Sequence, residues 1–224
     1  MTQSIDRRRL SREHVIRAGI ELADEEGPVA VSMRSLSGKL GVVPMALYKH
    51  VADKEDLTAG MLDMVVAGYL APPLTLTGIP AVRARVLAAR ITLGEHPWLR
   101  PVIEQATIHT PAVLAYMDAV AGDFAADGLS YDLIHYAMHA LGHRIWGFSP
   151  EAFAGARPAA APAPEVVAQM VASYPHVTAI ALDAARRNPA GACDEQFEFE
   201  FTLDLLLESI EHLHAASWTS RPLD

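Results

Sequence analysis

The stretch SMRSLSGKLGVVPMALYKHVADK, residues 32–54, contains the signals of two short helices joined by a tight turn. Ser32 can accept a backbone N–H as an N-cap, and the residues after it predict a first helix over 33–40. Gly41 then allows a sharp turn that a side chain would resist. The first half of the stretch therefore predicts a short helix with a defined beginning and a defined end.

The second half of the stretch begins a new helix at Pro44, whose missing N–H would be unpaired at a first helical position anyway. This predicts a helix over residues 44–50, and Asp53 is expected to cap the helix that comes next. Two short helices joined in this way form a helix-turn-helix, in which the second helix enters a major groove of DNA. The stretch therefore predicts DNA binding.

A helix is predicted on each side of this pair. Residues 11–26 carry one apolar stripe at helical spacing, formed by Val15, Ala18, Gly19, Leu22 and Ala23. Residues 54–69 predict a fourth helix, which must pack against the first three because they have a small core. Since the fourth helix also leads into the rest of the chain, it is the natural lever between the two parts.

The charge of the chain is distributed unevenly along its 224 residues. Residues 1–60 contain nine Lys and Arg and nine Asp and Glu, so the whole net charge of −9 belongs to residues 61–224. The basic residues of the first part include a cluster at its start, formed by Arg7, Arg8, Arg9 and Arg12. The charge distribution therefore permits DNA binding at the N-terminal end only.

After residue 80 the apolar periodicity predicts a larger helical body. Residues 157–164, RPAAAPAP, are expected to form an extended connection before a ninth helix with a possible break at Pro175, and the last helix should begin near residue 194. The helices before that connection are expected over residues 81–96, 97–107, 111–128 and 129–153. The sequence thus predicts an all-α protein.

The N-terminal motifs resemble those of the TetR family of bacterial transcriptional repressors. The matching motifs are RSL at 34–36, KLGV at 39–42, LYKH at 47–50 and KEDL at 54–57. A looser likeness continues through HPWLRPV, ALGHRIWG and FEFEFTLDLLLESIEHL. The resemblance implies a helix-turn-helix DNA-binding domain over residues 1–60 and a helical ligand-binding and dimerisation domain over 61–224. It also implies a repressor that leaves its operator when a small-molecule inducer binds.

The resemblance and the residue types together predict the DNA contacts. Arg34 can pair with guanine or with a phosphate, although a solvated arginine is the alternative. Tyr48 matches a phosphate-contacting tyrosine, and His50 could equally be a packing residue. The tip of the second helix is apolar and could touch thymine methyl groups. The expected DNA-binding residues are Ser32, Arg34, Val43, Pro44, Met45, Ala46, Tyr48, Lys49, His50 and Lys54.

A homodimer is expected through the eighth and last helices, which form the interface in the family. The eighth helix has an apolar seam at Ile134, Met138, Leu141, Ile145 and Phe148. The last helix has one seam at Phe199, Leu203, Leu206, Ile210 and Leu213, and a second stripe at Phe197, Phe201 and Leu205. A helix with two adjacent apolar stripes can face its own core and a partner at once.

A small-molecule site is expected in the body, because a few polar groups among aromatic side chains suit an apolar ligand of drug size. For any single residue, ordinary core packing is the alternative. The resemblance places the following residues on the helices that enclose the ligand: Trp98, Gln105, His109, Thr110, Tyr116, His139, His143 and Trp146.

Enzyme and metal signatures are missing from the sequence. His135, His139 and His143 share one helical face, but no HExxH motif, nearby cysteine or carboxylate pair completes a metal site. Ala106 stands where the tetracycline repressor has its magnesium-binding histidine, so a magnesium–tetracycline ligand is not expected. With no GxSxG, P-loop or GxGxxG motif, we expect no enzyme activity, metal or cofactor. The alternatives are a ligand-binding or adaptor protein with a vestigial helix-turn-helix, or a metal-dependent helical enzyme.

The sequence also bears on where the protein acts. Residues 64–82 are uncharged, but Pro72, Pro73, Gly78 and Pro80 interrupt them, so no membrane segment is expected. A lone cysteine, Cys193, excludes an intramolecular disulfide and fits a reducing compartment. The chain is therefore expected to be a soluble cytoplasmic protein.

Overall fold

The computed structural model describes residues 10–70, 75–105, 110–145, 163–187 and 195–221, and all regular elements in these ranges are helices. This confirms the predicted all-α class. The chain divides into two compact units, one of Met1–Gly147 with Ile210–Asp224 and the other of Phe148–Ser209. The first unit contains both the helix-turn-helix and most of the body, so the N-terminal helices pack continuously with the helices after them.

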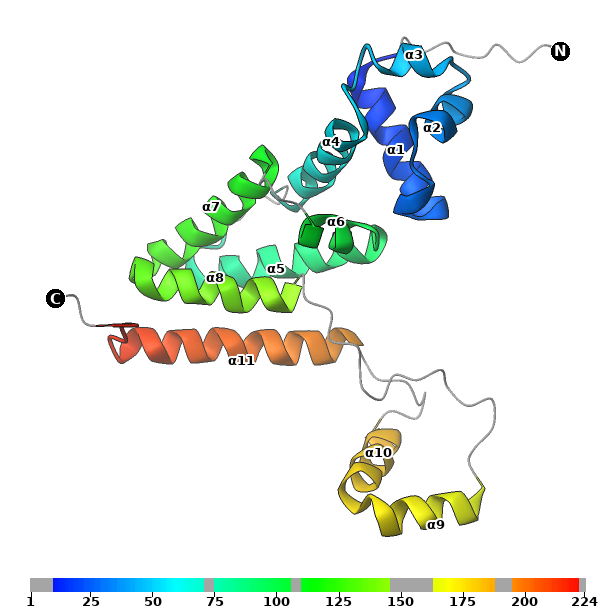
Figure 1. Cartoon of the computed structure of the whole chain (residues 1–224). Helices are drawn as coiled ribbons and strands as arrows, with labels where there is room; N and C mark the ends of the chain where they lie inside the picture. The colour runs from blue at the N-terminus through cyan, green and yellow to red at the C-terminus, as the bar shows by residue number, and fades with distance from the viewer. Residues whose placement is uncertain (1–9, 71–74, 106–109, 146–162, 188–194, 222–224) are drawn as a thin grey trace. The chain divides into compact units, whose positions relative to one another are not determined.

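The N-terminal helices are α1 (Arg12–Glu26), α2 (Met33–Leu40), α3 (Pro44–Leu47) and α4 (Lys54–Ala67), with a 3-10 turn η1 (Pro28–Ala30) after α1 (Figure 1). The bounds of α2 are those predicted. α3 is shorter than predicted: it ends at Leu47, and the chain continues as a turn in which His50 N–H donates to the Leu47 carbonyl at 2.8 Å.

Local signals account for these bounds. The Ser32 hydroxyl accepts from the Ser35 backbone N–H at 3.1 Å, and the Ser35 hydroxyl in turn accepts from the Ser32 N–H at 3.0 Å. This capping box satisfies two backbone donors at the start of α2. Gly41 ends the helix in the left-handed region with φ 64°, where glycine has no side chain to clash.

α1 and α4 pack closely because glycines lie in their contact. A Cβ atom added at Gly60 would come within 2.6 Å of the Ile16 Cδ1 atom, and one added at Gly19 would come within 3.0 Å of the Met61 sulfur. Leu57, which is fully buried, lies in the same contact. As predicted, α4 thus completes the small core of the first three helices.

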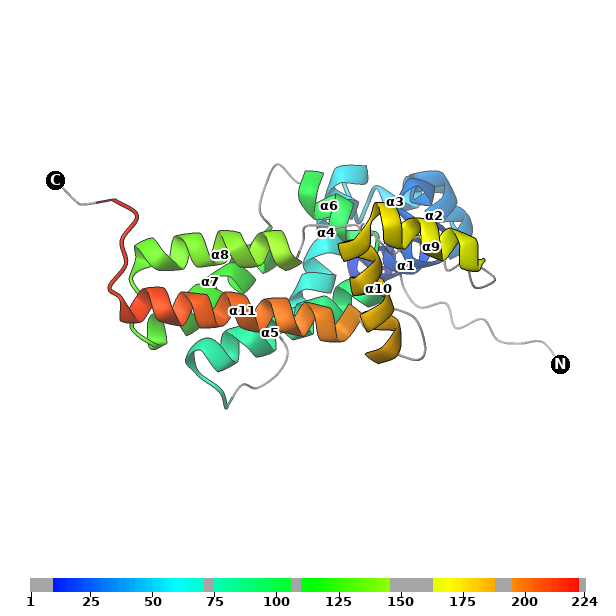
Figure 2. The same cartoon turned by 90° about the horizontal axis from the view of Figure 1, so that it is seen from below.

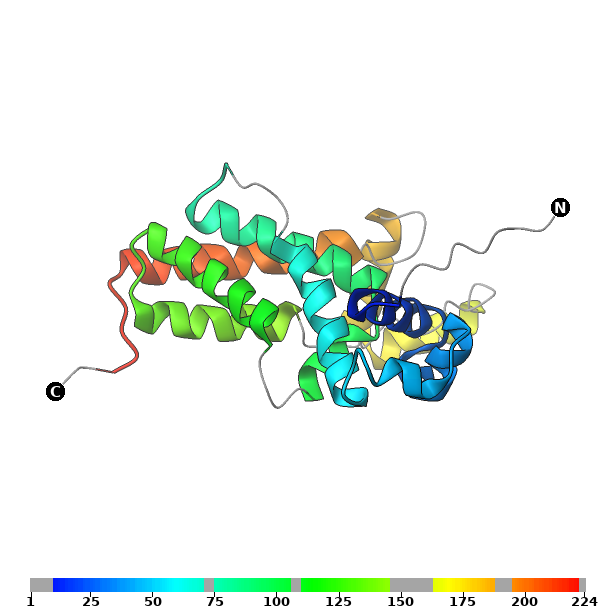
Figure 3. The same cartoon turned by 90° about the horizontal axis from the view of Figure 1, so that it is seen from above.

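The body contains α5 (Gly78–Glu95), α6 (Leu99–Gln105), α7 (Pro111–Ala126) and α8 (Tyr131–Ile145), preceded by the 3-10 turn η2 (Gly68–Leu70). α7 contacts α4, α5 and α8, as Figures 2 and 3 show from opposite sides. The core of these helices includes Val86, Phe124 and Leu141, each at most 1 % exposed. Of the predicted α8 seam, Ile134 and Leu141 are buried and Met138 is half-buried, while Ile145 and Phe148 lie outside the described side chains.

α5 begins three residues before the predicted start at residue 81. Gly78 adopts φ 68°, and the Asp127 carboxylate accepts the Ile79 backbone N–H at 2.7 Å. A side chain at Gly78 would overlap that carboxylate. Pro80 is tolerated because it falls in the first turn, where its missing N–H has no helical partner.

The second unit contains α9 (Pro164–Ser173), α10 (Pro175–Arg187) and the first part of α11 (Glu195–Ala215). The predicted break at Pro175 is confirmed. The buried residues of α11 are Phe199, Leu203, Leu207 and Ile210, so Leu207 replaces the predicted Leu206, which is half-buried, as is Leu213. Spacing of 4-4-3 follows the 3.6-residue period of a helix as well as the 4-3-4 spacing that was expected.

Within the described ranges, no helix is long and apolar enough to cross a membrane.

A candidate DNA-binding surface on a helical body

Some of the residues expected at the DNA surface are exposed to solvent, and others are half-buried or already hydrogen-bonded within the protein. Val43 and Met45 are 68 % and 71 % exposed, although both are apolar. The polar side chains expected at this surface on either side of them in the sequence are exposed as well: Arg34, Tyr48, Lys49 and Lys54. Leu47 and Val51 are buried, as expected for core residues. The tip of α3 is therefore an apolar surface flanked by cationic and hydrogen-bonding groups.

Three of the expected DNA-binding residues are less available. The Ser32 hydroxyl caps α2, so it is already hydrogen-bonded within the protein. Ala46 and His50 are half-buried, and the His50 carbonyl accepts a hydrogen bond from Arg12 at 3.0 Å. Of the basic cluster at the start of the chain, Arg7, Arg8 and Arg9 lie outside the described residues.

Arg12 forms an ion pair within the protein that the sequence did not indicate. Its guanidinium donates to both carboxylate oxygens of Asp56, at 2.6 and 2.7 Å. Asp56 also accepts the Ala52 backbone N–H at 2.8 Å. The hydrogen bond from Arg12, together with that backbone N–H, lowers the pKa of Asp56 to about 2. The network joins the start of α1 to α4 and to the turn after α3.

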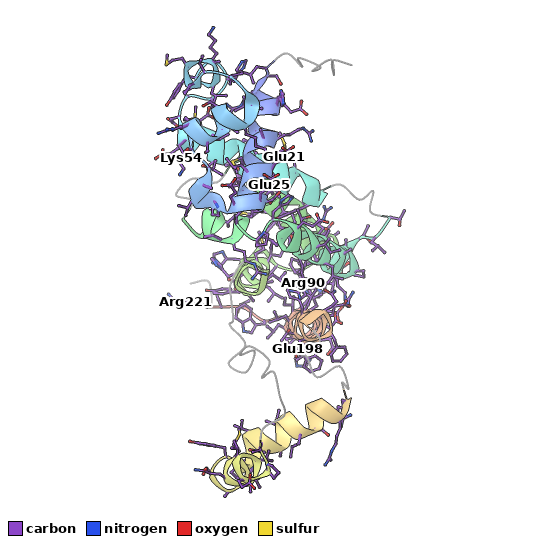
Figure 4. All side chains as sticks on the ribbon, turned by 90° about the vertical axis from the view of Figure 1, so that its right-hand side faces the viewer. Glu21, Glu25, Lys54, Arg90, Glu198 and Arg221 are labelled. Carbon is purple, nitrogen blue, oxygen red and sulfur yellow. The ribbon has the colours of Figure 1, made fainter. Side chains whose placement is uncertain are left out.

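A second ion-pair cluster joins α2 to α1. The Lys39 ammonium lies 2.9 Å from the Glu25 carboxylate and 3.5 Å from that of Glu21. Both glutamates project from α1, one turn apart (Figure 4). α1 therefore contacts both α2 and α4, the helices that precede and follow α3 along the chain.

The body contains a buried pair of tyrosines. The rings of Tyr69 and Tyr116 meet edge to face with their centroids 5.5 Å apart, and both side chains are at most 4 % exposed. Burial raises the pKa of both phenols. The Tyr116 hydroxyl has no hydrogen-bond partner among the described residues. A buried hydroxyl in this state costs free energy unless water or a ligand satisfies it.

A second such hydroxyl lies at the start of α7. Thr110 is the N-cap of α7, but its side chain makes no capping bond, and its buried hydroxyl has no partner in the described part of the chain. The Asp63 carboxylate of α4 instead accepts the Ala112 backbone N–H at 3.0 Å. Thr110 and Tyr116 thus both carry buried hydroxyls on the N-terminal part of α7.

Trp98, an expected ligand-binding residue, makes a contact with α1 that the sequence did not indicate. Its side chain is 4 % exposed, but its indole N–H donates to the Asp24 carboxylate of α1 at 2.6 Å. His96, the C-cap residue of α5, contacts the same Asp24 oxygen through Nδ1 at 2.8 Å. Sequence reasoning missed Asp24 and His96, since nothing local relates residues more than seventy positions apart.

Most of the other expected ligand-binding side chains lie outside the part of the chain that the structure describes. His109 and Trp146 lie outside the described residues, and so do the side chains of Gln105 and His143. His139 is exposed on α8, with its ring edge to face with that of His135 at a centroid distance of 4.7 Å. Among the side chains that the structure describes, no group of three or more His, Cys, Asp or Glu could hold a metal ion.

A helix-turn-helix with a cation-flanked tip, joined through α4 to a body of packed helices, defines a class of helical DNA-binding regulators. Residues 81–214 match the family described as tetracyclin repressor-like, C-terminal domain. The chain belongs to the TetR family of transcriptional regulators, as its N-terminal motifs indicated.

Individual relatives agree with this assignment. The chain is 35 % identical over 115 residues to the transcriptional repressor DrrR1 of Streptomyces coeruleorubidus, covering 50 % of this chain and 42 % of DrrR1. It is 29 % identical over 123 residues to a helix-turn-helix transcriptional regulator of Saccharopolyspora erythraea, covering 53 % and 51 %. The matches thus span about half the length of these curated relatives.

The fold is shared with solved structures of the same family. ActR of Streptomyces coelicolor, in complex with actinorhodin, superposes with a TM-score of 0.71 at 19 % identity, covering 94 % of this chain and all of that one. A likeness at this identity establishes the fold and confirms the predicted architecture.

The Arg12–Asp56 ion pair predicts a specific dependence of stability on pH. Because the folded-state pKa of Asp56, about 2, lies below the unfolded value of about 3.9, its contribution is fully present above about pH 5 and is lost as the pH falls through about 2. In Asp56→Asn, the free energy of unfolding should therefore vary less steeply across this range than in the wild type. Urea unfolding at a series of pH values measures both slopes.

Glu55→Gln removes one negative charge from the same helical turn and serves as the matched control. If Asp56→Asn and Glu55→Gln had the same slope as the wild type, the ion pair would not contribute to folding stability.

Proposed function

We propose that this protein is a DNA-binding transcriptional repressor that a small-molecule inducer releases from its operator, and that it acts in the cytoplasm as a homodimer. The observation that carries the proposal is the solvent-exposed apolar tip of α3, with exposed cations on either side of it in the sequence, on the helix that a helix-turn-helix presents to DNA. Membership of a family of transcriptional regulators supports it.

The exposed residues suit two kinds of DNA contact, one with phosphates and one with bases. Lys49, Lys54 and the Tyr48 hydroxyl are placed to contact phosphates, which set affinity and register. Arg34, exposed at the start of α2, can contact a base edge or a phosphate. The tip residues Val43 and Met45 offer no hydrogen bonds, so they suit thymine methyl groups.

The exposed stripe on α11 supports the homodimer. Phe197, Phe201 and Leu205 are 66 %, 56 % and 46 % exposed, and they recur every four residues along one side of the helix. The residues on its buried side, such as Leu203, are almost inaccessible. A contiguous exposed stripe of this kind marks an interaction surface. We propose that a second copy of the chain covers it, with α8 as the other interface helix.

A dimer gives the helix-turn-helix its required geometry. Two-fold symmetry presents two recognition helices to two successive major grooves, about 34–36 Å apart along the duplex. The separation of the two tips therefore decides whether both can bind at once. Any change in the body that alters this separation lowers operator affinity.

The buried hydroxyls of Thr110 and Tyr116 support a ligand site in the body. Both are without partners among the described residues, so a ligand with matching polar groups would satisfy them. Solved structures of the same fold include ActR in complex with actinorhodin and a TetR variant of Acinetobacter baumannii in complex with minocycline. We propose an apolar aromatic inducer that bears hydroxyl or carbonyl groups.

α4 provides a route from this site to the DNA surface. The Asp63 carboxylate of α4 binds the N-terminal turn of α7, beside Thr110. A ligand that displaces the start of α7 therefore acts directly on α4, whose other end carries the Asp56 network. To release DNA, such a ligand must bind the DNA-free conformation more tightly than the DNA-bound one.

Lys49→Ala should weaken DNA binding to every sequence and reduce the salt dependence. Removing one phosphate contact lowers the slope of log affinity against log salt by about 0.9. Fluorescence anisotropy at several salt concentrations, with operator and unrelated duplexes, measures both effects. Arg187→Ala, which removes an exposed cation of α10, is the control and should keep the wild-type slope. An unchanged slope in Lys49→Ala would place the DNA-contacting surface elsewhere.

Phe201→Glu should dissociate the dimer. Burial of one phenylalanine contributes about 1.5–3 kcal/mol, and two-fold symmetry doubles the loss, so the dissociation constant should rise by at least about 100-fold. Sedimentation equilibrium measures it. Ile91→Glu, at a position 62 % exposed on α5, is the matched control. Dissociation by Ile91→Glu but not by Phe201→Glu would move the interface away from α11.

Tyr116→Phe should leave the ligand-free protein as stable as the wild type, or more stable by up to about 1–2 kcal/mol, because it removes a buried hydroxyl without a partner among the described residues. The same change should weaken binding of a hydroxyl-matching inducer by about tenfold. Urea unfolding and titration with a panel of aromatic compounds that includes actinorhodin measure the two effects. A loss of more than about 1 kcal/mol would show that the hydroxyl has a structural partner.

The same panel tests the release mechanism. Operator affinity is measured with and without each compound that binds the body. A compound that saturates the body but leaves operator affinity unchanged is not an inducer, and the mechanism fails if every binding compound behaves in this way.

A further inference from the structure

The C-terminal end of α1 is bound directly to the body. Asp24 lies three residues before Gly27, which ends α1, and one of its carboxylate oxygens is shared by two donors from the junction of α5 and α6. These donors are His96 Nδ1 at 2.8 Å and Trp98 Nε1 at 2.6 Å. A carboxylate oxygen accepts hydrogen bonds, so the contact is made when the His96 ring has its N–H at Nδ1.

The two donors are held rigidly by the body. Trp98 is 4 % exposed and directly precedes α6, and its ring contacts that of His96 at a centroid distance of 6.1 Å. The His96 backbone N–H donates to the Thr92 carbonyl in the last turn of α5. Neither donor can follow α1 without disturbing α5 or α6, so the direction of α1 is tied to that of the body.

This contact completes a two-point attachment of α1. Arg12 binds its N-terminal end to Asp56 of α4, while Asp24 binds its C-terminal end to the junction of α5 and α6. A helix attached at one end only can swing about that end. Attachment at both ends fixes its direction, and α2 and α3 are fixed with it because Lys39 pairs with two glutamates of α1.

We propose that Asp24 is a positioning residue for operator binding: by locking α1 to the body, it sets the separation of the two recognition helices in the dimer. The inference rests on the homodimer proposed above, because a monomer has no such separation. Asp24 does not touch the DNA surface. It acts through α1, and its loss should change which operator spacings bind rather than how one half-site is recognised.

The same contact connects the ligand site to the DNA surface by a second path, besides α4. Trp98 precedes α6, and α7 with its N-cap Thr110 is the next helix along the chain. A ligand that shifts α6 would move the indole N–H away from Asp24 and release α1. The ligand-bound protein and the Asp24 variants should then resemble each other in their tolerance of operator spacing.

The test uses operators selected from random duplexes by the full-length protein. Each operator is remade with its two half-sites one or two base pairs closer or farther apart, and a single half-site is included. Affinities are measured for the wild type, Asp24→Ala, Asp24→Asn and the control Glu26→Ala, which removes another α1 carboxylate. All measurements are made well below the melting temperature of the least stable variant.

We expect the wild type and Glu26→Ala to prefer one spacing by about tenfold over its neighbours, since a mismatched separation strains both halves. Asp24→Ala should reduce this preference to about twofold or threefold while binding the single half-site as the wild type does. Asp24→Asn keeps an acceptor oxygen and should recover part of the preference.

The outcomes separate the two proposals. If the wild type shows no spacing preference, the dimer proposal fails and the positioning role of Asp24 fails with it. If the wild type has a sharp preference that Asp24→Ala retains, Asp24 contributes only to stability and the inference is overturned, whatever the melting temperature. Equal reductions in affinity for the single half-site and the full operator would also overturn it.

Discussion

The close packing of α1 on α4 is the contact on which the other features depend. Gly19 and Gly60 lie in this contact and allow the two helices to approach, and the Arg12–Asp56 pair fixes their direction. The first three helices alone bury too little apolar surface to be stable. Once α4 covers them, the helix that completes their core is the same one that enters the body, so neither part can move without the other.

This arrangement explains how α1 supports both the helix-turn-helix and the body. α1 is the common support: it holds α2 by ion pairs, α4 by close packing and the body by Asp24. None of these groups is among the residues proposed to contact DNA. In the proposed mechanism, the residues that touch DNA are therefore distinct from those that position them, and a ligand that acts on α1 or α4 would change binding without altering the contact surface.

Sequence predicted best where the physical cause was local. The bounds of α2 are set by Ser32 and Gly41, which act within a few residues of their own positions. The early start of α5 could not be predicted, because the carboxylate that binds its first turn belongs to Asp127, nearly fifty residues later. The end of α3 at Leu47 was missed as well, since a helical turn and an open turn differ little in local sequence.

The candidate functional residues show the same contrast between features with a local cause, which could be predicted, and contacts with distant partners, which could not. The exposed cations and the apolar tip were predicted from motifs, and the structure places most of them at the surface. The hydrogen bond from the Trp98 indole N–H to Asp24 could not be predicted, because the two residues are 74 positions apart. The ion pair between Arg12 and Asp56 could not be predicted either. An arginine in a basic cluster resembles a DNA-binding residue until its partner is known.

The exposed tip of α3 has a consequence for how such proteins diverge. Val43 and Met45 make up most of the exposed apolar tip, while Leu47 and Val51 supply the packing that the turn requires. Replacing a tip residue should therefore have little effect on folding stability, since surface substitutions are usually close to neutral. Under the proposed division of DNA contacts, duplicated copies of the gene would acquire new operators through single changes there while keeping the fold, the proposed dimer and the proposed ligand response.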